Sequence, residues 1–159
     1  MVSVVKDEHG VWNNCIQLGT CHANSFSVNK LLTNGLVEKQ YQNYWLAPDN
    51  KPAEFVLDLG CNKIVNMMEL VNTHNAYHRD RSAKEFKVFT SSFKDGPWQM
   101  VVHKTLQDSR AHADPLPVLS FPFSTYSEAT ARFVKFNLIS WYGYGGGLQY
   151  FAVKGIKSH

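Results

Sequence analysis

The chain has 159 residues, 44% of them hydrophobic and 18% charged, which is the composition of a folded domain and excludes a disordered chain. Its formal net charge of +3 is too small to indicate a nucleic-acid-binding surface, which normally shows as a clustered basic stripe. No stretch approaches the roughly 18 apolar residues that a membrane-spanning helix needs. We therefore expect one domain over residues 1–159 with a substantial core.

The N-terminal residues carry charges where a signal peptide would carry its apolar segment. Lys6, Asp7 and Glu8 fall within that region. Either the protein is not secreted by that route, or the sequence is part of a longer protein.

Strand patterns dominate the chain in order. Residues 25–32 give the only hint of a short helical turn, and the later apolar or alternating segments predict strands at 55–59, 64–71, 86–90, 98–102, 116–123, 132–138 and 148–153. Turn residues separate several of them, at 95–97, at 114–115 and in the glycine-rich tract 143–147. Many short strands without a long amphipathic helix predict an all-β sandwich or jelly roll, with function on loops at one end.

The glycine-rich tract is unusual because it interleaves aromatic residues with glycines. Trp141, Tyr142 and Tyr144 stand among Gly143, Gly145, Gly146 and Gly147. Glycines allow tight turns and close approach of the backbone to a ligand, and exposed rings can stack on the apolar face of a sugar. The alternative interpretation is that Trp141 and Tyr142 fold back and close the end of the sandwich.

Several motifs together resemble the discoidin domain, the coagulation factor 5/8 type C domain of the galactose-binding-like superfamily. They comprise Leu-Thr-Asn-Gly at 32–35, Tyr-Trp-Leu-Ala-Pro at 44–48, Phe-Val-Leu-Asp-Leu-Gly at 55–60, Arg81, Phe-Lys-Val-Phe-Thr-Ser at 86–91, Asp-Gly-Pro-Trp at 95–98, Ala-Arg-Phe-Val-Lys-Phe at 131–136, Tyr-Gly at 142–143 and Gly-Leu at 147–148. The resemblance covers residues 25–155. It implies a jelly roll of about eight strands that binds sugars, phospholipid surfaces or proteins with loops at one end, usually without catalysis and usually outside the cell.

Apolar alternation predicts the core, and the resemblance adds to it and sets our expectation for calcium. We expect the core to include Phe55, Leu57, Leu59, Phe86, Val88, Phe133 and Phe136, which carry the alternation except for Phe133, placed by analogy to the family strand. Trp45 stands at the family's buried tryptophan. Calcium-binding members carry carboxylates where this chain has Thr33, Asn34 and Gln149. Asn34 and Gln149 are therefore candidate ligands only of a weak or structural calcium ion, because calcium prefers several oxygens with some negative charge.

The three cysteines leave two alternatives open. Cys15, Cys21 and Cys61 are all reduced, or Cys15 and Cys21 close a small loop. The terminal disulfide of the coagulation factors is missing. No CxxC pair occurs, which argues against a zinc site made of thiolates.

The richest polar segment, residues 72–82, follows one predicted strand and precedes another, so we expect a loop that faces a ligand. Imidazole, guanidinium and amide groups suit sugar hydroxyls because they offer donors and acceptors at fixed angles. The candidate ligand-binding residues are His74, Asn75, His78, Arg79 and Arg81 from this loop, Tyr142 and Tyr144 from the glycine-rich tract, and Tyr44 at the edge.

Plainer interpretations of the same loop stay open. Arg81 is equally explained by a structural pairing with a carboxylate at a strand end, and the other polar residues by an ordinary solvated loop. His74 and His78 have the spacing of a helical metal pair, but only Asp80 offers a third ligand. Nothing resembles a nucleophile elbow or an oxyanion turn, so we do not expect an enzyme.

The leading hypothesis is a non-catalytic carbohydrate-binding module whose partner is a glycan or glycoprotein. One alternative is a protein–protein adhesion or scaffold module. The other is a module that binds phospholipid surfaces, for which residues 45–46 form the only candidate apolar spike and the nearby charge is thin.

Overall fold

The computed structural model describes residues 2–3, 45–124 and 130–155. Tyr44, Asn34, Cys15, Cys21 and the expected helical turn at 25–32 lie outside the described residues. Cys61 is described, and it is a free, exposed thiol.

The described elements are strands, apart from one short 3₁₀ helix. They are β1 (Val2–Ser3), β2 (Trp45–Leu46), β3 (Ala53–Asn72), η2 (Ala76–His78), β4 (Arg81–Ala83), β5 (Glu85–Ser91), β6 (Gln99–Thr105), β7 (Val118–Pro122), β8 (Thr130–Leu138), β9 (Trp141–Gly143) and β10 (Gly147–Gly155). In the described part of the chain, no helix is long and apolar enough to span a membrane.

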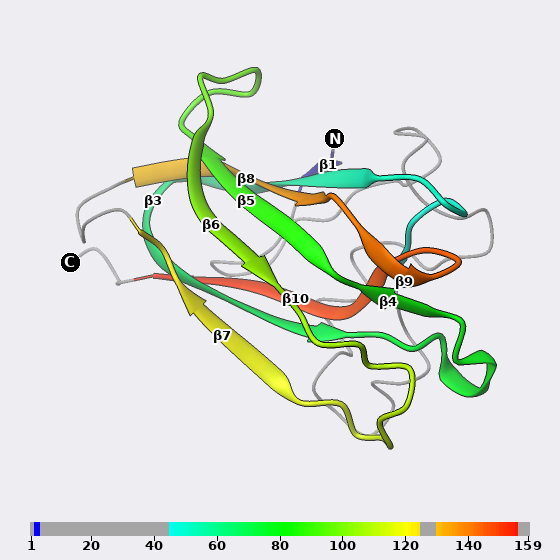
Figure 1. The fold of residues 1–159 in the computed structure, drawn as a ribbon. Coiled ribbons are helices and arrows are strands. Elements are labelled where there is room, and N and C mark those ends of the chain that lie inside the picture. The colour runs from blue at the N-terminus through cyan, green and yellow to red at the C-terminus, as the bar shows by residue number, and fades with distance from the viewer. Residues whose placement is uncertain (1, 4–44, 125–129, 156–159) are drawn as a thin grey trace.

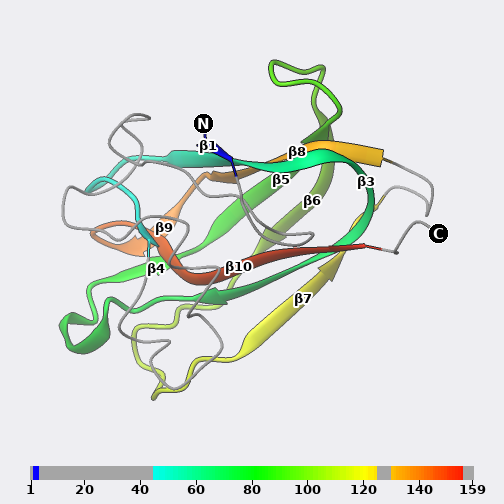
Figure 2. The same ribbon diagram turned by 180° about the vertical axis from the view of Figure 1, so that it is seen from behind.

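Strand β3 belongs to both layers of the sandwich. Its first half pairs with β8 and with β1, and its second half pairs with β10 and β7. One layer therefore runs β1-β3-β8-β5-β6 and the other β2-β10-β3-β7. Figures 1 and 2 show β3 bending from one layer into the other. The small β4–β9 ladder lies at the end of the sandwich away from that bend.

The predicted all-β sandwich is confirmed, with one difference along β3. The sequence predicts separate strands at 55–59 and 64–71 because Gly60 looks like a terminator. The structure instead has a single strand of 20 residues. Its pairing with β8 shifts register between Asp58 and Lys63, so the strand bends there without ending.

The predicted core residues are all buried, and aromatic packing organises them. The rings of Phe55 and Phe136 stack with centroids 5.3 Å apart, and Trp45 meets Phe55 edge-on at 5.2 Å. Phe133 is only 5% exposed but is not part of the main cluster, whereas its neighbour Val134 is. Consecutive strand residues point to opposite faces, so Phe133 packs on the other side of β8, where the Arg132 guanidinium lies 5.1 Å from its ring centroid.

Replacing Phe86 by alanine should lower the free energy of unfolding by about 3–5 kcal/mol, because the ring is fully buried and stacks on Phe136. Chemical denaturation of the purified domain measures this loss. Phe93→Ala is the matched control, since that ring is 67% exposed and its removal should change stability by less than about 0.5 kcal/mol. An unchanged denaturation midpoint in Phe86→Ala would contradict the core described above.

Candidate functional site

The ladder between β4 and β9 brings the 72–82 loop and the glycine-rich tract together. Arg81 pairs with Gly143 and Ser82 pairs with Tyr142. Just beyond the ladder, the Tyr144 amide donates to the Asp80 carbonyl oxygen at 2.8 Å. Two segments about 60 residues apart in sequence thus lie side by side at this end of the sandwich (Figure 1).

The glycines of the tract serve close backbone packing. Gly143 has φ +79°, and a Cβ at this position would lie 2.3 Å from the Asp80 carbonyl oxygen. A Cβ at Gly147 would lie 2.3 Å from the carbonyl oxygen of Trp45. The tract needs glycine because it lies directly against two other backbone segments.

The two tyrosines of the tract differ in exposure. Tyr142 is half-buried: its hydroxyl donates to the Leu106 carbonyl oxygen at 3.0 Å, and the Lys84 ammonium lies 5.2 Å from its ring centroid. Tyr144 is 63% exposed. Tyr144 therefore offers an open ring face, while Tyr142 supports the loop that follows β6.

The 72–82 loop buries three of its candidate residues, His74, Asn75 and Arg81. His74 is fully buried, and its Nε2 lies 3.0 Å from Oδ1 of Asp114. Asn75 is 8% exposed and donates from Nδ2 to Oδ1 of Asp80 at 2.9 Å. These side chains make contacts within the protein that hold the loop.

Other side chains of this loop face solvent. Tyr77 is 84% exposed, and its ring centroid lies 4.2 Å from that of the exposed His78. Arg79 is also exposed and has a left-handed backbone with φ +49°. Its Nη1 donates to the carbonyl oxygens of Arg110 at 3.1 Å and His112 at 2.7 Å.

Arg81 is buried, and its contacts are those of a structural residue. It is 4% exposed, donates from Nη1 to the Ala47 carbonyl oxygen at 3.0 Å and forms an ion pair with Asp49. Asp49 lies in the connection between β2 and β3. The arginine thus fastens that connection to β4.

The connection between β6 and β7, residues 106–117, is a third segment at this end. The sequence predicted a turn at 114–115 within it but no site residue. Ser109 donates from Oγ to the Thr73 carbonyl oxygen at 2.8 Å. Hydrogen bonds from the Arg110 guanidinium lower the pKa of the Asp108 carboxyl, so this carboxylate stays ionised at neutral pH. The run of polar residues over 107–112 was the available signal, but it did not indicate a partner.

The described residues contain no group of three or more His, Cys, Asp or Glu side chains placed to hold a metal ion. His74 and His78 do not form a pair, since one is buried against Asp114 and the other is exposed beside Tyr77. Gln149 is fully buried, and neither atom of its amide has a hydrogen-bond partner within the described ranges. Its Oε1 fits one neutral oxygen ligand of a calcium ion, while Asn34 lies outside those ranges.

The comparisons with known proteins rest on structure alone. No protein-family model and no curated protein sequence matches the chain. Chitosan-binding module 1 of a chitosanase/glucanase from Paenibacillus sp. IK-5 superposes with a TM-score of 0.64 at 17% identity, covering 86% of this chain and 90% of that one. The family 32 carbohydrate-binding module of Clostridium perfringens NanJ, solved with galactose, gives 0.61 at 12% identity, covering 84% and 88%.

A second family 32 module from Clostridium perfringens, solved with GalNAc-β-1,3-galactose, gives a TM-score of 0.62 at 14% identity and covers 84% of this chain and 89% of that one. At these identities the likeness establishes the fold. The chain has a jelly-roll β-sandwich fold like that of these carbohydrate-binding modules, which is the fold class that the sequence predicted.

Gly143→Ala should destabilise the domain by roughly 1–3 kcal/mol, because alanine is strained at this φ and its Cβ would meet the Asp80 carbonyl oxygen. Thermal or chemical unfolding measures the loss. Tyr144→Ala, one residue away, is the control and should unfold like the parent because that ring is exposed. Equal stability of Gly143→Ala and the parent would show that the tract does not lie against residue 80 in solution.

Micromolar calcium should leave the melting temperature unchanged, because Gln149 supplies a neutral amide where a tight site would carry a carboxylate. Differential scanning fluorimetry in calcium and in chelator checks this. Gln149→Glu is the matched variant: the buried charge should lower stability in chelator, and calcium should restore more of it than in the parent. A large upward shift of the parent in micromolar calcium would overturn this expectation.

Proposed function

We propose that this protein is a non-catalytic carbohydrate-binding module that binds glycans at the end of the sandwich formed by the 72–82 loop and the glycine-rich tract. The observation that carries the proposal is the β4–β9 ladder. It brings the backbone of Tyr144, whose ring is exposed, next to Asp80 of the loop that carries the exposed His78 and Arg79. An exposed ring beside hydrogen-bonding side chains is the combination that a sugar needs, with one apolar face and several hydroxyls.

The candidate residues divide into two roles in this proposal. Tyr144, His78 and Arg79 contact the sugar, while Tyr44, the candidate expected at the edge of the site, lies outside the described residues. The remaining four, His74, Asn75, Arg81 and Tyr142, position the loops through the contacts described above. Exposed Tyr77 offers a second ring next to His78, which the sequence reading did not include.

The ligands of the structural neighbours agree with this reading. The neighbours were solved with galactose, with GalNAc-β-1,3-galactose and, for a second chitosan-binding module, with chitotriose. They differ in sugar while sharing the fold, so the ligand depends on loop side chains. We infer a neutral or amino sugar at a shallow site whose single-site affinity is weak, with tight binding arising from several copies acting together.

A glycan array with the purified domain selects the sugar, and calorimetric titration of that sugar then tests the site. Tyr144→Ala should weaken binding at least about fivefold, because a stacked ring contributes about 1–3 kcal/mol by its area and geometry. Arg79→Ala should also weaken binding. Both variants must first show the parent's melting temperature.

Phe93→Ala and Lys94→Ala are the matched controls, because both side chains are exposed on the β5–β6 connection, at the other end of β5 from the ladder. They should bind like the parent. If Tyr144→Ala and Arg79→Ala also bind like the parent, the site lies elsewhere on the molecule. If no glycan binds while a protein partner does, the protein–protein alternative replaces the proposal.

A further inference from the structure

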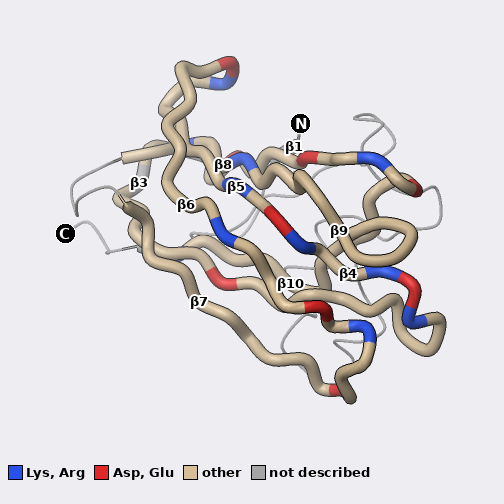
Figure 3. Tube along the Cα trace, viewed as in Figure 1, with Lys and Arg blue, Asp and Glu red and all other residues tan. Residues whose placement is uncertain are grey.

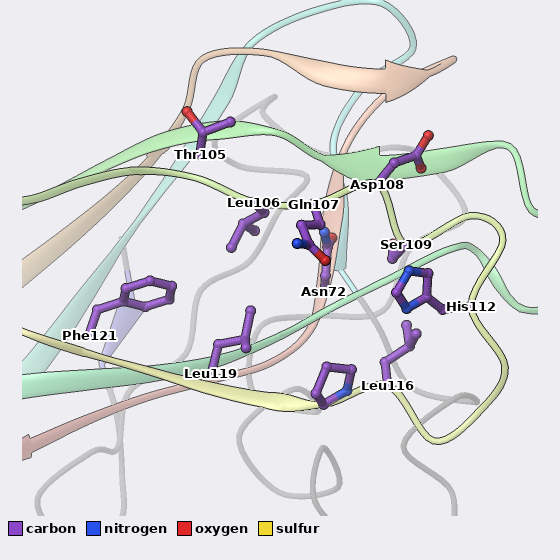
Figure 4. A pocket seen from close by; sticks show the side chains of 11 residues that line it. Asn72, Thr105, Leu106, Gln107, Asp108, Ser109, His112, Leu116, Leu119 and Phe121 are labelled. Atoms are coloured by element: carbon purple, nitrogen blue, oxygen red, sulfur yellow. The ribbon is translucent and has the colours of Figure 1, made fainter.

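A cavity of about 310 Å³ opens at the side of the sandwich, between the connection that follows β6 and strand β7. We call it the seam pocket. Leu106, Leu116, Leu119 and Phe121 supply apolar side chains to its lining, and Gln107 and His112 stand at its polar edge (Figure 4). Tyr144, His78 and Arg79 are not among the residues that line it, so the pocket is separate from the proposed glycan site.

The polar groups deepest in this lining are already satisfied. The Asn72 amide donates to Ser82 Oγ and the Ala83 carbonyl oxygen and accepts from the amides of Thr73 and Ala83. Ser109 Oγ donates to the Thr73 carbonyl oxygen. Of the other polar lining side chains, those of Thr105, Gln107 and His112 make no hydrogen bond to any described residue, and the Thr105 hydroxyl points away from the pocket (Figure 4). The side chains of Gln107 and His112 therefore remain for a ligand.

This shortage of hydrogen-bonding groups excludes a sugar ring. A buried pyranose brings several hydroxyls, and each one left without a partner costs free energy. A charged ligand is disfavoured too, because the Asp108 carboxylate is paired with Arg110 and points away from the pocket (Figure 4). The lining suits an uncharged, largely apolar ligand with one hydrogen-bonding group.

The volume of the pocket indicates the size of that ligand. A dry cavity of roughly 150 Å³ accommodates benzene, so about twice that volume accommodates two fused rings.

The pocket wall is preformed, which lowers the cost of binding. Several hydrogen bonds tie the 106–117 connection to the 72–82 loop, among them Arg79 to the carbonyl oxygens of Arg110 and His112, Asp114 to His74, and Ser109 to Thr73. A wall held in this way does not have to be ordered when a ligand enters.

We propose that the seam pocket binds an uncharged bicyclic aromatic small molecule with a single hydrogen-bonding group, of which indole is the simplest example. The ring system packs between Leu106, Leu119 and Phe121. Its N–H donates to the Gln107 amide oxygen or to the imidazole of His112.

Titration of the domain with indole, followed by ¹H–¹⁵N NMR, tests this directly. We expect saturable shifts at the amides of Leu106, Leu116 and Phe121, with a dissociation constant on the order of a millimolar or below for so small a ligand. N-acetylglucosamine at the same concentration should leave these amides unshifted.

Leu119→Trp fills the pocket and should abolish the indole shifts. Val118→Trp is the matched control, because the neighbouring side chain is 43% exposed on β7 and does not line the pocket. If Leu119→Trp fails to fold, Gln107→Leu is the second test, because Gln107 is exposed. The loss of one hydrogen bond should weaken the affinity for indole roughly fivefold.

Three results would overturn the proposal: no saturable shift at these amides, equal binding by the Leu119→Trp and Val118→Trp variants, or stronger shifts from the sugar than from indole. The proposed glycan function is tested independently. Leu119→Trp should still bind the selected glycan like the parent, so a failure of the pocket proposal leaves the glycan proposal unaffected.

Discussion

The amide of Asn72 is the constraint on which the loop end of this molecule depends. Asn72 is the last residue of β3, and its side chain makes four hydrogen bonds: two donated, to Ser82 Oγ and the Ala83 carbonyl oxygen, and two accepted, from the amides of Thr73 and Ala83. It closes both ends of a loop that spans 10 or 11 residues. The loop can therefore leave the sheet and return to it without a long hairpin of its own.

The other contacts at this end of the sandwich build on the closed 72–82 loop. With Ser82 fixed, its hydroxyl accepts from the Ser109 amide at 3.0 Å, which brings the 106–117 connection against the loop. β4 then pairs with β9, and the pairing carries Tyr144 to the same end. The hydrogen bonds of Asn72, Ser82 and Ser109 specify this arrangement, because each one left unmade would leave a desolvated donor or acceptor.

The sequence was sufficient for the fold because its signals were local and repetitive. Alternation along 86–90 and the order of the family motifs predicted the strands and the seven core residues, all of which are buried. The course of β3 was not predictable in the same way. Gly60 looks like an end in the sequence, but the strand continues through it, since its second half finds partners in β10 and β7.

The loop side chains were harder to assign for a physical reason. Histidine, asparagine and arginine have the same chemistry whether they face a sugar or a neighbouring carbonyl group. His74 and Arg81 are buried because of Asp114 and Asp49, which are 40 and 32 residues away in sequence. Only long-range packing decides between the two roles, so residue type alone pointed to the loop but not to its exposed members.

Arg79 belongs to the proposed glycan site and also contacts the wall of the seam pocket. Its Nη1 already donates to two carbonyl oxygens of the 106–117 connection, while the residue remains exposed. A guanidinium has five N–H donors, so the same side chain can hold the pocket wall and still offer donors to a hydroxyl. Removing Arg79 consequently loosens a wall as well as deleting a contact, whereas removing Tyr144 deletes only a ring. Of the two residues, Tyr144 thus reports on sugar contact alone, and any excess effect at Arg79 measures how far the wall and the glycan loop depend on each other.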